Sequence, residues 1–149
     1  MEDVIKRLLK EIEEGDTVLD VGCGDGSLIK DLEKRKDIKI MGTDPFPSNW
    51  ECYNFLAEEI EEIGENFDVI YLVKSFHHIQ KPELFLKSAK KVLKNNGKLI
   101  ILDWKYGIDT GIKERYYRVE EIVNMLNKYG FNIVKKEETQ EIVFVVARV

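Results

Sequence analysis

Three glycines at alternate positions follow a short apolar run near the start of the chain. Residues 18–26 read Val-Leu-Asp-Val-Gly-Cys-Gly-Asp-Gly, and residues 27–32 continue with the apolar spacing of a helix. A strand, a glycine turn and a helix start favour anion and nucleotide binding, because the first N–H groups of the helix point outward and glycine lets a ligand approach the backbone. The dinucleotide motif G-x-G-x-x-G needs glycine at position 27, where the chain has Ser27. The loop therefore departs from the NAD-binding pattern.

Two further sets of side chains could do chemistry beside that loop. Asp44 lies 20 positions after Gly24, where the neighbouring strand ends, and a carboxylate there can accept hydrogen bonds from both hydroxyls of a ribose. In isolation an aspartate before Pro45 is a turn residue, an interpretation that the glycine loop weakens. His77 and His78 are the only histidines and follow a buried apolar run. Neighbours on an extended segment point in opposite directions, so we expect at most one to face a substrate.

The elements that position these residues alternate regularly along the chain. Apolar spacing predicts helices at residues 4–12, 26–36, 58–63, 85–93 and 122–129. Apolar runs bounded by turn residues predict strands at residues 17–21, 38–42, 52–56, 67–73, 98–102, 131–136 and 142–147. The last two strands form a hairpin through residues 138–140. The expected fold is α/β, with five strands in βα repeats and a terminal antiparallel pair.

Composition limits the classes of protein that fit. A chain of 149 residues is one domain (1–149) by default, and its net charge of −5 argues against tight, non-specific binding to nucleic acid. No stretch has the apolar length of a membrane span, and no signal peptide is visible. Cys23 and Cys52 lack a metal-ligand spacing, so no metal site is predicted. A disulfide at Cys23 would obstruct the glycine loop, which favours a reducing cytoplasm. The excess of Lys, Glu and Ile hints at a thermophilic source.

The run D-x-G-x-G-x-G resembles motif I of the class I S-adenosylmethionine (SAM)-dependent methyltransferases. Residues 41–44, 67–83 with the histidine pair, and 93–99 carry the same resemblance in the family's order. It covers nearly the whole chain and is closest to the small-molecule branch of ubiquinone and menaquinone biosynthesis methyltransferases, the methyltransferase type 11 domain. The resemblance implies a Rossmann-like, seven-stranded, mostly parallel sheet with an antiparallel last strand. The helix between the second and third strands is shortened or missing here, because residues 45–50 hold two prolines.

The resemblance also implies a cofactor site at the strand ends. It places Asp20 beneath the methionine part of SAM and Asp44 on the ribose, while backbone carbonyls of residues 74–76 face the methionine amino group. The side chain of Lys74 itself is expected at the surface. The implied cofactor-binding residues are Asp20, Gly22, Cys23, Gly24, Gly26, Asp44, Pro45, Ala57, Glu58, Lys74, Ser75 and Phe76.

One departure concerns the adenine. The family often places an acid where this chain has Leu56, so Glu58 or the backbone of Ala57 is the expected substitute. Phe46 or Trp50 is a candidate cover for the adenine face, and a stray surface aromatic or a core contact is an equal alternative for each.

The acceptor side has few signals. About 15 residues precede the strand at residues 17–21, so the N-terminal lid of the family is expected to be nearly absent. The aromatic segment at residues 104–117 is either an acceptor wall or an anchor for the last helix. His78 is favoured as a hydrogen-bond partner or general base for an acceptor hydroxyl or amine. In the alternative, the histidine pair only shapes the cleft.

The implied reaction is methyl transfer from SAM to an unidentified small-molecule acceptor, with S-adenosylhomocysteine (SAH) as the product. A non-catalytic SAM-binding module, or one subunit of a two-chain methyltransferase, is the alternative. The expected open cleft suggests that a second copy or a partner subunit covers it. An NAD-dependent oxidoreductase disagrees with Ser27 and with the terminal hairpin.

Overall fold

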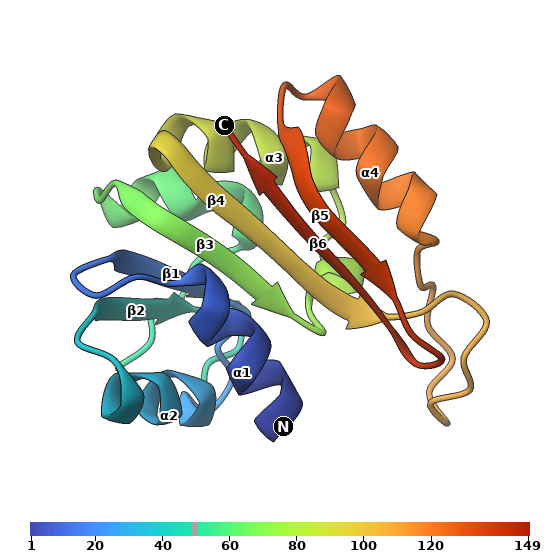
Figure 1. Ribbon diagram of the computed structural model, residues 1–149, viewed down its shortest axis with the longest axis horizontal. Helices are drawn as coiled ribbons and strands as arrows, with labels where there is room; N and C mark the ends of the chain where they lie inside the picture. Colours follow the sequence, from blue (N-terminus) through green and yellow to red (C-terminus); the bar gives the residue numbers. More distant parts are fainter. Residues whose placement is uncertain (49–50) are drawn as a thin grey trace.

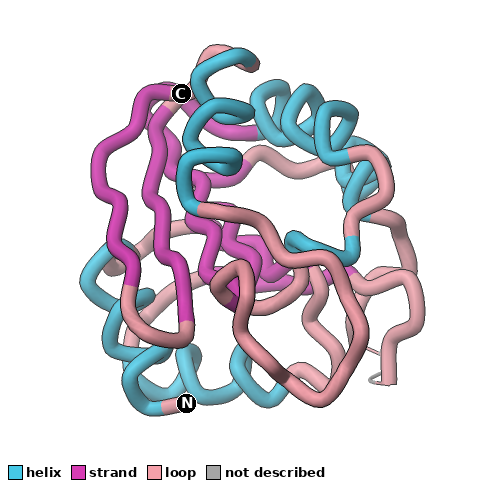
Figure 2. Tube along the Cα trace, turned by 90° about the vertical axis from the view of Figure 1, so that its right-hand side faces the viewer, coloured by secondary structure: helices cyan, strands magenta, loops and turns pink. Residues whose placement is uncertain are grey.

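Six strands form a single sheet with helices on both sides (Figures 1 and 2). The computed structural model describes residues 1–48 and 51–149. The strand order across the sheet is β2-β1-β3-β4-β6-β5. The strands are β1 (Thr17–Val21), β2 (Lys39–Thr43), β3 (Phe67–Val73), β4 (Leu93–Trp104), β5 (Asn132–Glu138) and β6 (Ile142–Arg148).

The sheet confirms the mixed topology expected for the fold. Strands β1 to β4 pair in parallel with one another. Strand β6 lies between β4 and β5 and is antiparallel to both. The mostly parallel sheet with an antiparallel last strand is therefore confirmed.

The prediction of a seventh strand at residues 52–56 is wrong. Within the described residues, that segment makes one isolated parallel bridge, Thr43 to Tyr53. The hydroxyl Oγ1 of Thr43 lies 3.1 Å from both the backbone N and O of Phe55. These side-chain hydrogen bonds take the place of further backbone pairing between the two segments. The described residues between β2 and residue 57 form no helix, as predicted, and a 3-10 helix, η1 (Ala57–Ile63), follows.

Each face of the sheet has its own core. Helices α1 (Glu2–Glu11) and α2 (Ser27–Arg35) pack on one face with Val69 and Tyr71 of β3. Helices α3 (Pro82–Val92) and α4 (Val119–Lys128) pack with η1 on the other face, against Ile70 and Leu72. Alternate residues of β3 thus point into opposite cores, which explains its nearly unbroken apolar run.

Helix α1 is fixed to the sheet by charge as well as by apolar contact. The buried Glu11 carboxylate lies 3.3 Å from Nζ of Lys98 and 3.0 Å from Nζ of Lys135. Burial favours the neutral acid, but the two ammonium groups outweigh it and lower the pKa of Glu11 below its ordinary value. In the part of the chain that the structure describes, no helix is long and apolar enough to cross a membrane.

Candidate functional site

A cavity of about 660 Å³ lies at the carboxyl ends of β1, β2 and β3, where open α/β sheets bind their ligands. It brings together five separate segments of the chain. The predicted site residues in its lining are Gly22, Asp44, Pro45, Ala57, Glu58, Lys74, Ser75 and His78. Five other predicted residues are absent from that lining: Asp20, Cys23, Gly24, Gly26 and Phe76.

The glycine loop fits closely against the end of β3. Gly22 has a φ of +90°, and a Cβ atom there would lie 2.6 Å from Cβ of Ser75. Ser75 Oγ in turn donates a 2.7 Å hydrogen bond to the carbonyl of Val21. At Gly24, by contrast, a Cβ atom would meet nothing within 4 Å. The loop is thus closely packed at its first glycine and open to a ligand at its second.

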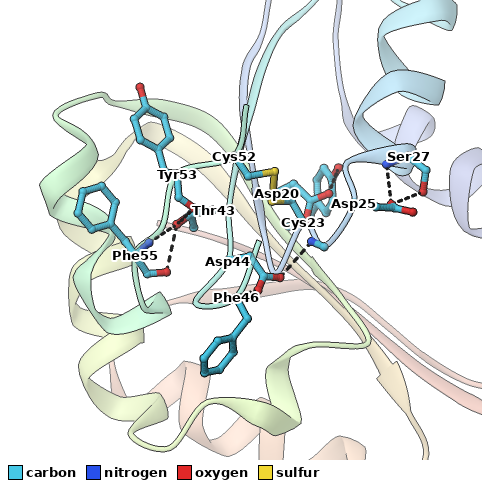
Figure 3. Close-up of a disulfide and its surroundings, with 12 residues drawn as sticks. Asp20, Cys23, Asp25, Ser27, Thr43, Asp44, Phe46, Cys52, Tyr53 and Phe55 are labelled. Carbon is cyan, nitrogen blue, oxygen red and sulfur yellow. Dashed lines mark hydrogen bonds between the residues drawn. A yellow bond between two sulfur atoms is a disulfide. The ribbon is translucent and has the colours of Figure 1, made fainter. Parts of the chain in front are cut away.

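Asp44 is held at the cavity by the backbone of two loops (Figure 3). Its Oδ2 accepts a 3.0 Å hydrogen bond from the N–H of Gly24, and its Oδ1 accepts a 2.8 Å bond from the N–H of Phe46. Each carboxylate oxygen keeps a lone pair for a further donor. The carboxylate is therefore fixed in place and still able to bind a diol.

Asp20 lies behind the loop, in the core. The hydroxyl of Tyr71 donates a 2.7 Å hydrogen bond to its Oδ2, and its side chain is buried. Burial raises the pKa of Asp20 to about 7, against the lowering effect of the Tyr71 hydroxyl, and the charge of Asp44 adds to the rise. Asp20 can therefore act on a ligand only through the loop or through its charge.

The prediction that Cys23 stays unpaired is wrong, because the structure joins Cys23 to Cys52 by a disulfide (Figure 3). The disulfide does not obstruct the site. The Cys23 side chain packs on β2, where a Cβ atom on Gly42 would lie 2.6 Å from Cβ of Cys23. The sulfur of Cys23 lies against β2, Cys23 is absent from the cavity lining, and the argument from Cys23 for a reducing cytoplasm loses its basis.

The adenine-side candidates differ in their surroundings. Phe46 lines the cavity and is 88% exposed, and Leu56 lines it at 48% exposure. Glu58 also lines the cavity, while its Oε2 accepts a 3.3 Å hydrogen bond from the N–H of Lys81. Trp50 lies outside the described residues. An apolar ring and a carboxylate thus flank this end of the cavity.

Two predicted residues at the end of β3 have other surroundings than expected. Phe76 is fully buried in the core, 5.4 Å from the ring of Tyr117. Lys74 has a φ of +57°, and its Nζ lies 4.1 Å from the ring centre of Trp104. Lys74, expected at the surface, is half-buried, and its ammonium gains electrostatic attraction over the indole face.

The two histidines share one 3-10 turn, η2 (Phe76–His78), and their ring centres are 4.0 Å apart. The expectation that they point in opposite directions is wrong, because it assumed an extended backbone. The His77 side chain is 3% exposed, whereas that of His78 is 60% exposed and lines the cavity.

His77 lies between two carboxylates that the sequence patterns did not single out. Its Nδ1 is 2.8 Å from Oδ1 of Asp103, and its Nε2 is 2.7 Å from Oε2 of Glu114. Burial opposes a charge on this ring, but the two carboxylates outweigh it and raise the pKa of His77. Asp103 follows the apolar core of β4 directly, as Asp20 does in β1, and that likeness is the signal that could have found it.

The aromatic segment after β4 serves the core more than the cavity. Tyr116 is buried, donates or accepts a 2.8 Å hydrogen bond with Thr110, and packs edge-on against His77 at 4.8 Å. Tyr106 is exposed beneath the guanidinium of Arg118. A second hollow, of about 590 Å³, is lined by residues 106–109 and 111–116 of this segment.

A family model described as a methyltransferase domain matches residues 1–136. The chain belongs to this methyltransferase family. A solved SAM-dependent methyltransferase from Aquifex aeolicus is similar in structure, with a TM-score of 0.77, 25% identity, and 97% of this chain and 89% of that chain covered. A Burkholderia thailandensis 1,6-didemethyltoxoflavin-N1-methyltransferase, solved with SAH, also has a TM-score of 0.77, at 16% identity over 98% of this chain and 75% of that one.

The methyltransferase domain also has curated relatives. A ubiquinone biosynthesis O-methyltransferase of Azorhizobium caulinodans is 31% identical over 98 residues, which are 56% of this chain and 38% of the relative. One from Rhizobium etli is 28% identical over 102 residues, covering 59% and 41% of the two chains. The matches thus span about two fifths of these relatives. The fold of this methyltransferase domain is that of the class I SAM-dependent enzymes.

Proposed function

We propose that this chain binds SAM in the cavity at the ends of β1 to β3 and transfers its methyl group to a small-molecule acceptor, leaving SAH. The observation that carries the proposal is the fixed Asp44 carboxylate beside the open backbone of Gly24, in a chain of the methyltransferase family. A ribose diol needs such a carboxylate, and a ligand needs such an open glycine to approach the backbone.

The lining fits the two ends of this cofactor. Phe46, Leu56 and Ala57 supply apolar surface for a flat base beyond the ribose, and Glu58 offers a carboxylate for its amino group. Toward the other end, the backbone carbonyls of residues 74–75 can accept hydrogen bonds from the amino group of an amino acid. Asp20, behind the loop, favours a cation there without touching it.

Bound SAM supplies a methyl group on a positively charged sulfur. A lone pair of the acceptor attacks the methyl carbon, and the sulfur leaves with the electron pair of the carbon–sulfur bond. The chain contributes by holding the acceptor in line with that bond and by excluding water. His78 lines the cavity and is the only histidine among its described lining residues. We assign it the task of hydrogen-bonding the acceptor hydroxyl or amine, or of accepting its proton.

The exposed Phe46 at the cavity supports a cover made by another chain. We propose that a second copy or a partner subunit supplies it; a Haloferax volcanii chain of similar fold was solved in complex with the Trm112 methyltransferase activator. Light scattering at several concentrations, with and without SAH, should show association. A monomer under all conditions would argue against a cover supplied by a second copy of the chain.

We further propose that the activity is cytoplasmic. The disulfide is compatible with this, because intracellular proteins of hyperthermophiles are disulfide-rich and the composition is rich in Lys, Glu and Ile. Fractionation of the source cells, followed by detection of the chain, would test the compartment.

Thermal unfolding with added ligands tests the cofactor. SAM and SAH should each raise the melting temperature, because a ligand that binds only the folded state stabilises it by mass action. NAD serves as the control and should leave the melting temperature unchanged. A rise with NAD and none with either sulfur compound would overturn the proposal.

A further inference from the structure

The two histidines and Glu114 meet from two different connections of the fold. His77 and His78 end the turn after β3, while Glu114 belongs to the segment between β4 and α4. Their ligand atoms, one from each residue, all lie within 4.8 Å of one another. Two ligands of a zinc ion sit about 3.0–3.4 Å apart, given bonds of about 2.1 Å, so small side-chain rotations bring the three atoms into ligand positions.

Asp103 prepares His77 for such a role. Both of its carboxylate oxygens lie within 3.0 Å of His77 Nδ1, and its Oδ2 accepts a 2.9 Å hydrogen bond from the N–H of His77. Metal-bound histidines usually donate their second ring N–H to a carboxylate, a backbone carbonyl or water, and Asp103 supplies such a partner at Nδ1. The other nitrogen, Nε2, lies 2.7 Å from Oε2 of Glu114, and an ion between the two would take the place of the proton that they share. The His77 and Asp103 side chains are each only 3% exposed, so this orientation is rigid.

We propose that His77, His78 and Glu114 bind a divalent transition metal ion of the Zn²⁺ type, with Asp103 orienting His77. Two imidazole nitrogens and one carboxylate oxygen suit Zn²⁺, Fe²⁺, Mn²⁺ or Co²⁺, whereas an all-oxygen set would suit Mg²⁺ or Ca²⁺. Three protein ligands leave coordination positions open, as in catalytic rather than structural sites. The sequence patterns predicted no metal site, because Glu114 comes 36 positions after His78, the second of the two adjacent histidines.

The position of the site gives the ion a function, which rests on the proposed methyl transfer. His78 lines the SAM cavity, and Glu114 lines the hollow beside it, so the ion lies between the two. An acceptor hydroxyl bound at an open coordination position of the ion would lose its proton more readily, and the proton would pass to water. The oxygen lone pair then forms the bond to the methyl carbon, and the pair of the breaking carbon–sulfur bond goes to sulfur. His78 in this case holds the ion instead of accepting the proton.

Calorimetric titration of the chelator-treated full chain with Zn²⁺ tests the site. We expect one ion per chain, and at least a tenfold loss of affinity in Glu114→Gln, which keeps the shape of the side chain. Glu120→Gln, an exposed position on α4, is the matched control and should bind as the wild type does. Co²⁺ should report the same stoichiometry by its visible absorption, which Glu114→Gln should change.

The Zn²⁺ and SAH titrations together separate the outcomes. No stoichiometric Zn²⁺ binding, or equal binding by wild type and Glu114→Gln, would overturn the metal site. The latter result would show that Zn²⁺ binds without Glu114, and therefore not at the three-ligand site. SAH titrated into the same metal-free protein tests the cofactor cavity independently. SAH binding without Zn²⁺ binding would reject the metal alone, and Zn²⁺ binding without SAH binding would reject the proposed function alone.

Discussion

Asp20 makes the stability of this chain depend on pH in an unusual direction. Burial raises the pKa of Asp20 from an ordinary 3.8 to about 7. Between these values the folded chain holds a proton that the unfolded chain has lost, so stability falls as pH rises. At about 1.4 kcal/mol per pKa unit, the full loss is about 4 kcal/mol, of which about 3 kcal/mol falls between pH 4 and pH 7. Asp20→Asn removes this titration and keeps an oxygen to accept the hydrogen bond from Tyr71.

Urea unfolding of both proteins from pH 4.5 to pH 8 measures the effect. The stability of Asp20→Asn relative to wild type should rise by about 3 kcal/mol as pH increases and level off just above pH 7. Subtracting the unfolding free energies of the two proteins at each pH removes the contribution of groups that titrate alike in both. Asp37→Asn, at an exposed position, is the control and should track wild type within about 0.5 kcal/mol. Parallel curves for wild type and Asp20→Asn would refute the reasoning.

Three further predictions concern the cavity. Asp44→Ala should weaken SAH binding in calorimetry by about 1.5–3 kcal/mol, the value of hydrogen bonds to a charged group; unchanged affinity would make Asp44 a turn residue. Gly22→Ala should lower the melting temperature more than Gly64→Ala, because both have positive φ but only Gly22 has Ser75 within 2.6 Å of the new Cβ; equal shifts would contradict the close fit. His78→Ala should lower turnover roughly a hundredfold while SAH affinity holds. If a chelator lowers the turnover of the wild type, His78 acts as a metal ligand. If a chelator leaves that turnover unchanged, His78 acts as a base.

Local sequence patterns predicted the fold well where each strand has a strong pattern of its own. Strands β1 and β3 have the predicted bounds, and the inserted hairpin strand is confirmed. The error at residues 52–56 has a tertiary cause. Whether that segment forms a strand depends on its partner, and Thr43 satisfies the partner groups with its side chain. An isolated propensity cannot show that competition.

The candidate site was predictable to a smaller extent. The glycine turn and Asp44 have fixed spacing along the chain, so the sequence alone points to both. Asp103 and Glu114 come close to His77 only through the pairing of β3 with β4 and the path of the next loop. Cys23 and Cys52 meet for a similar reason, since both lie beside the end of β2. Contacts of this kind depend on tertiary structure and leave no local signal.

The position of β6 in the middle of the sheet has a consequence for the order of folding. Strand β4 pairs with β6 along seven residue pairs, yet α4 and β5 come between them in the chain. Until β6 arrives, the hydrogen-bonding edge of β4 stays open, and β5 has no neighbour in the sheet. Pairings so distant in sequence close slowly, because the loop entropy is lost before the contacts form. A state in which β1 to β4 have paired and β6 has not would therefore expose an unpaired strand edge, the feature that promotes aggregation.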